Sequence, residues 1–248
     1  MKSNIEWRFW GRTDPLWSVA SWPGKAAADG AAWTDDEFLS LGKSDFDDIL
    51  RQWEHYGLSK ERCVEIGCGA GRMTSQLASA FGSVAALDVS AEQIDRAKRI
   101  LGERASNCEF LIVDKPSIPL PDGTASAMFS CHVFQHFAEF GGVVEYLSEA
   151  HRVVRVGGTI CFHVPVPGAH RNSTASKIRL ATRNVALSIK RMFGGRRLME
   201  YHRYSPTLIF KTLEQLGFDE PEMRIFNMKS NGDAHSFFFA RRSQQCDA

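Results

Sequence analysis

The feature that most constrains this chain is a regular alternation of short apolar runs with amphipathic segments, which begins at Arg62. Strands that alternate with helices predict a parallel sheet covered by helices on both faces. We predict strands at 63–66, 84–87, 110–113, 127–131 and 159–164. Helices are predicted at 73–81, 91–101 and 143–153, and Gly157-Gly158 is predicted as a turn before the fifth strand.

The pattern changes near the end of the sequence. A helix is predicted at 206–216, ended by Gly217, and two strands follow near 222–228 and 236–240. Asn231-Gly232 lies between these strands, and an Asn-Gly pair there predicts an antiparallel hairpin. The expected fold is therefore α/β, with a doubly wound and mostly parallel seven-stranded sheet that ends in an antiparallel hairpin.

Four segments are expected along the chain. Residues 1–42 are rich in tryptophan with Pro and Gly breaks, so we expect an irregular segment there, which could cover the site as a lid. Residues 43–168 should form the core, beginning with a helix at 43–56. Residues 169–203 read as a basic helical insertion, and residues 204–248 should complete the core.

Composition limits the classes of protein. The 248 residues are 44% hydrophobic and 24% charged, which is ordinary for a globular protein, and the formal net charge is +1. Binding to nucleic acid or membrane would need local clusters of charge. No apolar run is long enough to span a bilayer, and Met1 to Trp10 does not resemble a signal peptide. The six cysteines form no CxxC pair, so we expect no metal site and a reducing, cytoplasmic location.

A glycine-rich loop follows the first predicted strand. Gly67, Gly69 and Gly71 lie between that strand and the next helix, where the absence of a Cβ allows sharp turns and close approach of a ligand. The dinucleotide fingerprint requires glycine at the sixth position of such a loop, and Arg72 stands there instead. A nicotinamide-dependent oxidoreductase is therefore disfavoured, although a site for another nucleotide stays open.

Acidic residues stand at the carboxyl ends of the first three strands. Glu65 belongs to the first strand, Asp88 closes the second and Asp114 follows the third. Open α/β sheets bind ligands at this edge, and an acidic side chain after the second strand can accept hydrogen bonds from ribose hydroxyls. Asp88 could also simply cap the helix that begins at Ala91. Its coincidence with the glycine loop favours the ribose role.

These residues together resemble the class I methyltransferases, which use S-adenosylmethionine and carry an acidic residue followed by Gly-x-Gly-x-Gly. The resemblance covers residues 43–164 well and the region after Tyr204 more loosely. It implies that S-adenosylmethionine is the cofactor. The residues that the resemblance places around the cofactor are Lys43, Glu65, Gly67, Cys68, Gly69, Asp88, Val89, Asp114 and Cys131.

The resemblance also implies separate roles for these residues. Gly67 and Gly69 would contact the methionine portion of the cofactor, with Cys68 as a small residue packed against it. Lys43 would bind the methionine carboxylate. Asp88 would hold the ribose, while Val89 and Asp114 would contact the adenine. The Cys131 carbonyl would accept from the methionine ammonium group.

The part of the sequence expected to face the methyl acceptor contains several histidines and no obligatory catalytic motif. His132, His136, His163 and His170 lie near the expected mouth of the crevice, and an imidazole can act as a general base near neutral pH. His136 and His163 rank first because they follow strand ends. The alternatives are that His136 fixes its loop and that His163 is a packed strand residue.

The basic insertion allows three interpretations. Residues 169–203 carry nine Lys and Arg residues against the single acid Glu200, with apolar residues at helical spacing. The segment could lie on an anionic membrane or lipid-linked acceptor, clamp an anionic small substrate, or pack as a solvated helix, even across a dimer. Aromatic residues for base stacking are sparse, which argues against nucleic acid.

The sequence thus predicts methyl transfer to a small-molecule acceptor, with oxygen favoured over nitrogen. In-line displacement from a sulfonium depends mainly on positioning and desolvation, so a base is needed only for a protonated acceptor. A non-catalytic S-adenosylmethionine-binding protein is one alternative. A methyltransferase for lipid-linked or other anionic macromolecules is another.

Overall fold

The computed structural model describes residues 2–137, 139–167, 199, 201–227 and 234–243. The Asn231-Gly232 turn and most of the basic insertion at 169–203 lie outside these residues, as does His170. Within the described residues, none of the helices combines the length and apolar character that spanning a bilayer requires.

Residues 2–19 form α1 (Lys2–Thr13) and α2 (Pro15–Val19), so the predicted irregular segment is wrong there. Residues 20–34 are irregular apart from the 3₁₀ turn η1 (Ala27–Asp29). Asp14 accepts a hydrogen bond from the Trp17 amide as the N-cap of α2, and Pro15 occupies its first turn, where a missing N–H costs nothing. Helix α1 packs against α5 (Ala91–Leu101), which explains how helices this short are stabilised.

Helix α3 (Asp35–Glu54) begins eight residues before its predicted start at Lys43. Thr34 and Glu37 form a reciprocal capping box there, which satisfies two amides at the helix start. The helix buries Phe38, Phe46 and Trp53 along one face. The Trp53 indole also donates to the Thr159 hydroxyl over 2.9 Å, which ties the end of α3 to the sheet.

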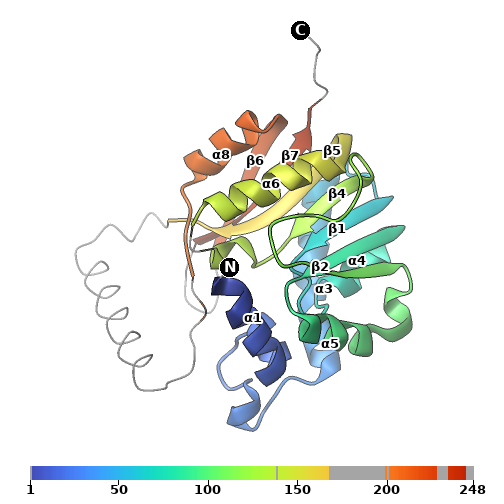
Figure 1. Ribbon diagram of the computed structural model, residues 1–248, viewed down its shortest axis with the longest axis vertical. Helices are drawn as coiled ribbons and strands as arrows, with labels where there is room; N and C mark the ends of the chain where they lie inside the picture. Colours follow the sequence, from blue (N-terminus) through green and yellow to red (C-terminus); the bar gives the residue numbers. More distant parts are fainter. Residues whose placement is uncertain (1, 138, 168–198, 200, 228–233, 244–248) are drawn as a thin grey trace, which may run out of the picture.

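One seven-stranded sheet runs through the molecule, as expected from the sequence (Figure 1). Its spatial order is β3-β2-β1-β4-β5-β7-β6, with parallel pairing from β3 to β5 and antiparallel pairing of β7 with both β5 and β6. The strands are β1 (Arg62–Ile66), β2 (Ser83–Asp88), β3 (Cys108–Ile112), β4 (Ala125–Ser130), β5 (Val154–Pro165), β6 (Phe218–Asn227) and β7 (Ala234–Arg242).

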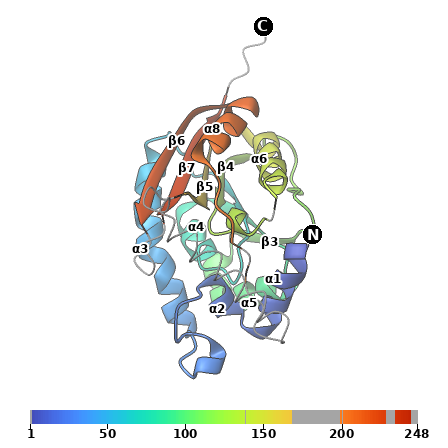
Figure 2. The ribbon, with the colours of Figure 1, turned by 90° about the vertical axis from the view of Figure 1, so that its left-hand side faces the viewer.

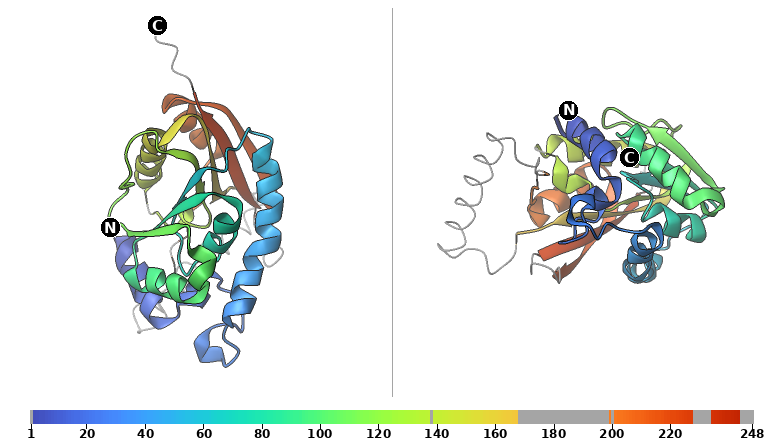
Figure 3. Two further views of the ribbon diagram at one scale, coloured as in Figure 1. Left: turned by 90° about the vertical axis from the view of Figure 1, so that its right-hand side faces the viewer. Right: turned by 90° about the horizontal axis from the view of Figure 1, so that it is seen from below.

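Helices cover both faces of this sheet. Figure 2 shows α3 and α6 (Gly141–Val153) on opposite sides, and Figure 3 shows α3 running along its own face. Helix α4 (Thr74–Ala80) shares the core on the α3 side, where Leu77 packs with Phe129 and Phe239. Helix α8 (Pro206–Gln215) shares the core on the α6 side, where Leu213 packs with Phe162 and Phe238. The 3₁₀ turns η2 (Gly102–Ala105) and η3 (Phe134–His136) complete the described elements.

The predicted turn at Gly157-Gly158 lies inside β5. Val154 pairs with Ala125 and Thr159 with Ala127, so three extra residues of β5 loop out between the two pairings. Gly157 accommodates this bulge with a φ of 75°. A side chain at Gly158 would place its Cβ 2.7–2.9 Å from three neighbouring atoms, so the fold requires glycine there.

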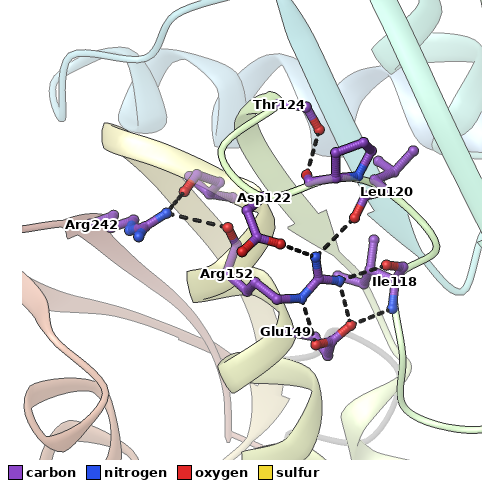
Figure 4. Close-up of polar contacts among 9 residues, drawn as sticks. Ile118, Leu120, Asp122, Thr124, Glu149, Arg152 and Arg242 are labelled. Atoms are coloured by element: carbon purple, nitrogen blue, oxygen red, sulfur yellow. Dashed lines mark hydrogen bonds and ion pairs between the residues drawn. The ribbon is translucent and has the colours of Figure 1, made fainter.

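An ion cluster fastens the loop between β3 and β4 to the end of α6 (Figure 4). The Arg152 guanidinium donates to both carboxylate oxygens of Glu149, to Asp122, and to the carbonyls of Ile118 and Leu120, all over 2.6–2.9 Å. Glu149 in turn accepts from the Ile118 amide over 2.8 Å. Arg152 thus supplies a partner for the Leu120 carbonyl, and it adds a second one for the Ile118 carbonyl, which also accepts from the Leu120 amide.

We expect Arg152→Ala to lower the free energy of unfolding by about 2–3 kcal/mol, because it removes several charge-assisted bonds and takes from the Leu120 carbonyl its side-chain partner. Arg155→Ala is the matched control. Arg155 forms a bidentate pair with Glu61 in which the side chains are 43% and 67% exposed, so its removal should cost less than about 1 kcal/mol. Urea unfolding of both variants measures the difference, and equal losses would contradict this account.

Candidate functional site

The glycine loop is held against the end of β2. The amides of Gly67 and Cys68 both donate to the Leu87 carbonyl, over 2.7 and 2.9 Å. Gly67 and Gly69 have φ values of 76° and 52°, which only glycine adopts readily. A Cβ on Gly67 would lie 2.2 Å from the Val133 side chain, so the loop also has no room for one.

Asp88 ties the same loop to β2 through its carboxylate. One oxygen accepts from the Gly69 amide over 2.8 Å, and the other accepts from the Ser90 amide over 2.9 Å. Burial raises the pKa of Asp88, while these amide bonds act in the opposite direction. The helix cap ahead of Ala91 comes from Ser90, whose hydroxyl accepts from the Gln93 amide. The capping alternative for Asp88 is therefore wrong.

Glu65 is a second carboxylate beneath the loop. It is 2% exposed and accepts from the Thr74 hydroxyl over 2.6 Å. Burial raises its pKa to about 7, and the nearby Asp88 carboxylate adds to this increase. A positively charged group bound beside Glu65 would therefore favour its ionised form.

Arg72 brings a buried positive charge close to the loop, where it acts on Glu65. Its side chain is 9% exposed and lies 3.5 Å from the Asp45 carboxylate, measured from Nη1. Its Nε atom is buried and has no hydrogen-bond partner among the described residues. Burial raises the pKa of Cys131 to about 12, and Arg72 is the largest influence that lowers it. A guanidinium with an open donor fits a carboxylate.

The N-terminal helices lie along the ends of β2 and β3. Arg8 donates to the Val89 carbonyl over 3.1 Å, and Asn4 donates to the Asp114 carbonyl over 2.6 Å. Val19 in α2 presses on the glycine loop, since a Cβ on Gly69 would lie 2.7 Å from it. The predicted adenine-side residues Val89 and Asp114 therefore bind α1 through their backbones, while the Asp114 side chain is exposed.

Three histidines meet where β4 and β5 end and β7 begins. His132, His163 and His235 each offer a ring nitrogen, and these atoms lie within 4.8 Å of one another. His163 Nε2 and His235 Nδ1 are 2.8 Å apart, and His235 Nε2 lies 2.9 Å from the Tyr201 hydroxyl. The His132 amide donates to His163 Nδ1 over 3.3 Å, from a residue whose φ is 61°.

The electrostatics keep His132 and His163 neutral. Burial lowers the pKa of His132 to about 3, with Arg72 and the neighbouring histidines adding to the effect. The pKa of His163 is also far below its ordinary value, for the same reasons. His136 is not one of these three but is close enough to act on His132 and His163. Its ring lies 4.6 Å from that of Trp7, and its Nε2 lies 3.0 Å from the side-chain amide nitrogen of Gln135.

The structure brings some predicted residues together and separates others. Glu65, Gly67, Cys68, Gly69 and Asp88 form one hub at the ends of β1 and β2. Lys43 is exposed on α3, and the residue before it, Gly42, packs against the backbone of Arg72.

Sequence reasoning missed three residues. Arg72 was noted only as a departure from the dinucleotide fingerprint, although an arginine that follows the loop glycines signals a charge near the ligand. Thr74 is an ordinary residue in the first turn of α4. His235 carried no signal, because only the antiparallel register of β5 with β7 brings it beside His163.

Comparisons with known proteins agree with this geometry. Residues 64–162 match the family model described as a methyltransferase domain. Malonyl-[acyl-carrier protein] O-methyltransferase from Methylococcus capsulatus is 27% identical over 152 residues, which cover 60% of this chain and 52% of the relative. The biotin biosynthesis bifunctional protein BioHC from Cellvibrio japonicus is 28% identical over 111 residues, which cover 45% of this chain and 21% of the relative. The matches thus span about half and about a fifth of these two proteins.

Solved structures share the fold. Phosphoethanolamine N-methyltransferase 2 from Haemonchus contortus, in complex with S-adenosyl-L-methionine, gives a TM-score of 0.60 at 16% identity and covers 85% of this chain and 58% of that one. An S-adenosylmethionine-dependent methyltransferase from Methanosarcina mazei gives 0.59 at 16% identity and covers 79% and 98%. Residues 64–162 are therefore a methyltransferase domain, and the seven-stranded sheet that contains them has the fold of the S-adenosylmethionine-dependent methyltransferases among these structures.

Proposed function

We propose that this chain transfers the methyl group of S-adenosylmethionine to an oxygen atom of a small-molecule acceptor. S-adenosylmethionine binding is supported above all by two buried groups of opposite charge beside the glycine loop. They are the Glu65 carboxyl and the Arg72 guanidinium. One relative is named for O-methylation and one structural neighbour for N-methylation. Oxygen remains our choice for this chain because the first of these relatives is also similar in sequence.

The residues present fit the cofactor. The amino-acid end of S-adenosylmethionine is a zwitterion, and Arg72 offers its open Nε to a carboxylate while Glu65 lies beneath the loop for the ammonium group. The Cys131 carbonyl is a further acceptor for that ammonium. Gly67, Cys68 and Gly69 supply a loop surface without side chains, apart from a buried thiol. Arg72 replaces the exposed Lys43 as the residue we assign to the carboxylate.

The adenosine end would lie over β2 and β3. The Asp88 carboxylate holds two amides and keeps further lone pairs that can accept from ribose hydroxyls. Val89 is half-buried next to it and offers an apolar contact for the adenine, with Asp114 at its edge. Contacts of α1 with Val89 and Asp114 would help to exclude water from this end.

When bound, the cofactor supplies a methyl group on a positively charged sulfur, so the protein contributes positioning and desolvation. We assign the removal of an acceptor proton, where one must leave, to His136, which is half-buried beside Trp7. His163 is a positioning residue instead, because its two ring nitrogens already bond the His132 amide and His235.

The first test is calorimetric titration with S-adenosylhomocysteine, with NADH as the control ligand. We expect saturable binding of S-adenosylhomocysteine alone. Asp88→Ala should weaken it about tenfold to a hundredfold, because charge-assisted bonds to the ribose and the Gly69 anchor are lost together. A folded wild-type protein that binds neither ligand, or binds NADH instead, would refute the proposal.

A second prediction separates Arg72 from Lys43. Arg72→Met should weaken S-adenosylhomocysteine binding by about tenfold or more, because it removes the partner of the carboxylate. The same variant should bind methylthioadenosine, which lacks the amino-acid end, with unchanged affinity. Lys43→Met is the matched control and should change neither affinity. Equal losses for both ligands in Arg72→Met would point to a general structural defect, and a loss in Lys43→Met would restore the original assignment.

A third prediction concerns pH. In the free protein Glu65 takes up a proton as pH falls through about 7. A bound ammonium group favours the carboxylate, so binding expels that proton and affinity should rise between about pH 5.5 and about pH 8. Glu65→Gln should flatten this rise. Calorimetry in buffers of different ionisation enthalpy counts the protons released, and an unchanged count in Glu65→Gln would exclude Glu65 as their source.

A further inference from the structure

We propose that His132, His163 and His235 bind one divalent transition-metal ion, with zinc as the best match, and that its open position takes an oxygen of the methyl acceptor. These three residues are called the histidine group. The metal site itself needs no cofactor, whereas its role toward the acceptor rests on the proposed function. The expected absence of a metal site was based on the spacing of the cysteines, which take no part in this group.

The histidine group offers the donor set of an open zinc site. Three ring nitrogens, one from each residue, lie within 4.8 Å of one another. Three histidines that leave a fourth position open are a known zinc arrangement, and the neutral imidazole is the form that binds. Burial lowers the pKa of His132 to about 3 and the pKa of His163 well below its ordinary value. Both rings are therefore neutral near pH 7, so no proton has to be removed before a metal binds.

Two of the three ligand atoms already stand close to the spacing of a metal site. His163 Nε2 and His235 Nδ1 are 2.8 Å apart, and two nitrogens at about 2.0–2.1 Å from one zinc ion lie roughly 3.3 Å apart in a tetrahedron. Pairing of β5 with β7 sets His163 opposite Phe237 and His235 opposite Pro165, so the sheet fixes their separation. A metal ion would replace the hydrogen between these two rings with little movement of either strand.

The outer nitrogen of His235 has a partner of the kind that metal ligands use. A metal-bound histidine usually donates its other ring N–H to a fixed acceptor, which sets the tautomer. His235 Nε2 lies 2.9 Å from the Tyr201 hydroxyl, whose oxygen can accept that hydrogen. A proton on Nε2 leaves the lone pair on Nδ1, which faces His163. This tautomer is the one that a metal on Nδ1 requires.

His132 is the ligand that must move. It has a φ of 61°, a left-handed conformation that is strained for a residue with a Cβ, and its ring centre lies 4.1 Å from that of His163. Its amide donates to His163 Nδ1 over 3.3 Å. A metal on His163 Nε2 places the ring proton on Nδ1, so this contact must open. A shift of half-buried His132 toward the metal would supply the third ligand and clear Nδ1 together.

The nearby charges determine which fourth ligand the ion prefers. Arg72 is the permanently charged group that acts on His132 and His163, and it opposes a cation there. The Asp45 carboxylate, 3.5 Å from Arg72 Nη1, offsets part of this charge. Three neutral ligands leave the ion with its full double charge, so a negative oxygen is the favoured fourth ligand. An acceptor hydroxyl that can ionise, or a carboxylate, provides such an oxygen.

One open position is sufficient for the proposed reaction. A divalent ion favours the ionised form of an oxygen beside it, as positive charge does in other metal sites. The acceptor proton leaves to His136, the acceptor oxygen bonds to the methyl carbon, and sulfur takes the electron pair of the broken S–C bond. His132 directly follows Cys131, whose carbonyl we assign to the ammonium group of the cofactor. The metal site therefore adjoins the methionine end of the cofactor.

The first experiment uses the full chain, freed of metal by a chelator, without S-adenosylhomocysteine. Calorimetry with Zn²⁺ and visible spectroscopy with Co²⁺ should each give one ion per chain. The Co²⁺ spectrum should be typical of nitrogen and oxygen ligands, without the near-ultraviolet band of thiolate ligands. Zn²⁺ should displace Co²⁺, because zinc suits a tetrahedral nitrogen site. Azide, a small anion that takes open metal positions, should change the Co²⁺ spectrum.

His132→Gly is the decisive variant. Glycine adopts a φ of 61° without strain, so the variant should be at least as stable to urea as the wild type. It lacks one ligand, so its affinity for Zn²⁺ should be at least about tenfold lower. His55→Ala is the matched control, because this exposed histidine caps the end of α3 and is no part of the histidine group. It should bind Zn²⁺ as the wild type does.

Two further variants test the surroundings of the ion. Tyr201→Phe should weaken Zn²⁺ binding about tenfold, because it removes the acceptor for His235 Nε2. Tyr204→Phe is its control and should change nothing, since the Tyr204 hydroxyl donates to the Phe137 carbonyl. Arg72→Met should strengthen Zn²⁺ binding about threefold or more, because it removes a positive charge close to the ion.

Several results would overturn the inference. They are no saturable binding of either ion by the folded chain, equal Zn²⁺ affinities of the wild type and His132→Gly, a thiolate band with Co²⁺, or unchanged Zn²⁺ affinity in Arg72→Met. A Co²⁺ spectrum that azide does not alter would overturn the role toward the acceptor. Binding of S-adenosylhomocysteine without metal binding would refute this inference alone. Metal binding without binding of S-adenosylhomocysteine would refute the proposed function and leave the metal site standing.

Discussion

The structure depends on the junction where the ends of β1 and β2 meet. Leu87 accepts two amides of the glycine loop through its carbonyl, and Asp88 accepts a third through its carboxylate. These bonds fix the loop before any ligand arrives, so its conformation costs nothing at the moment of binding. Glu65 and Arg72 are both buried beside this junction. Their burial strengthens each electrostatic contact that they make.

Burial on both faces of the sheet explains why its strands could be predicted from the sequence. The parallel strands are apolar along most of their length, and amphipathic helices alternate with them, so their periodicity is strong. The hub of Glu65, the glycines and Asp88 is also local, because parallel strands align their carboxyl ends at one edge. Periodicity thus predicts both the layers and the cofactor edge. The predicted start of β5 is at residue 159, after the observed start at Val154, because Gly157-Gly158 is typical of a turn. In the structure these glycines form a bulge within the strand.

Other features depend on long-range contacts that periodicity does not contain. Helices α1 and α2 are short, and they are stabilised by α5 rather than by their own sequence, so the tryptophans and breaks suggested an irregular segment. His235 enters the site through the register of two antiparallel strands, which no local pattern specifies. In the sequence, Arg72 is only the residue that stands where the dinucleotide fingerprint requires glycine. The structure shows that its Nε is buried and has no hydrogen-bond partner among the described residues. Each miss concerns a partner distant in the sequence.

The position of β7 has a consequence for the order in which the molecule assembles during synthesis. Strand β6 pairs only with β7 in the described sheet, so it has no place at the edge until β7 inserts between it and β5. The hydrogen bonds within the hub at the ends of β1 and β2 join residues between 65 and 90, whereas the group of His132, His163 and His235 waits for residue 235. A nascent chain therefore completes the junction for one reactant well before the last strand emerges, and the other half of the site forms only when the sheet is closed.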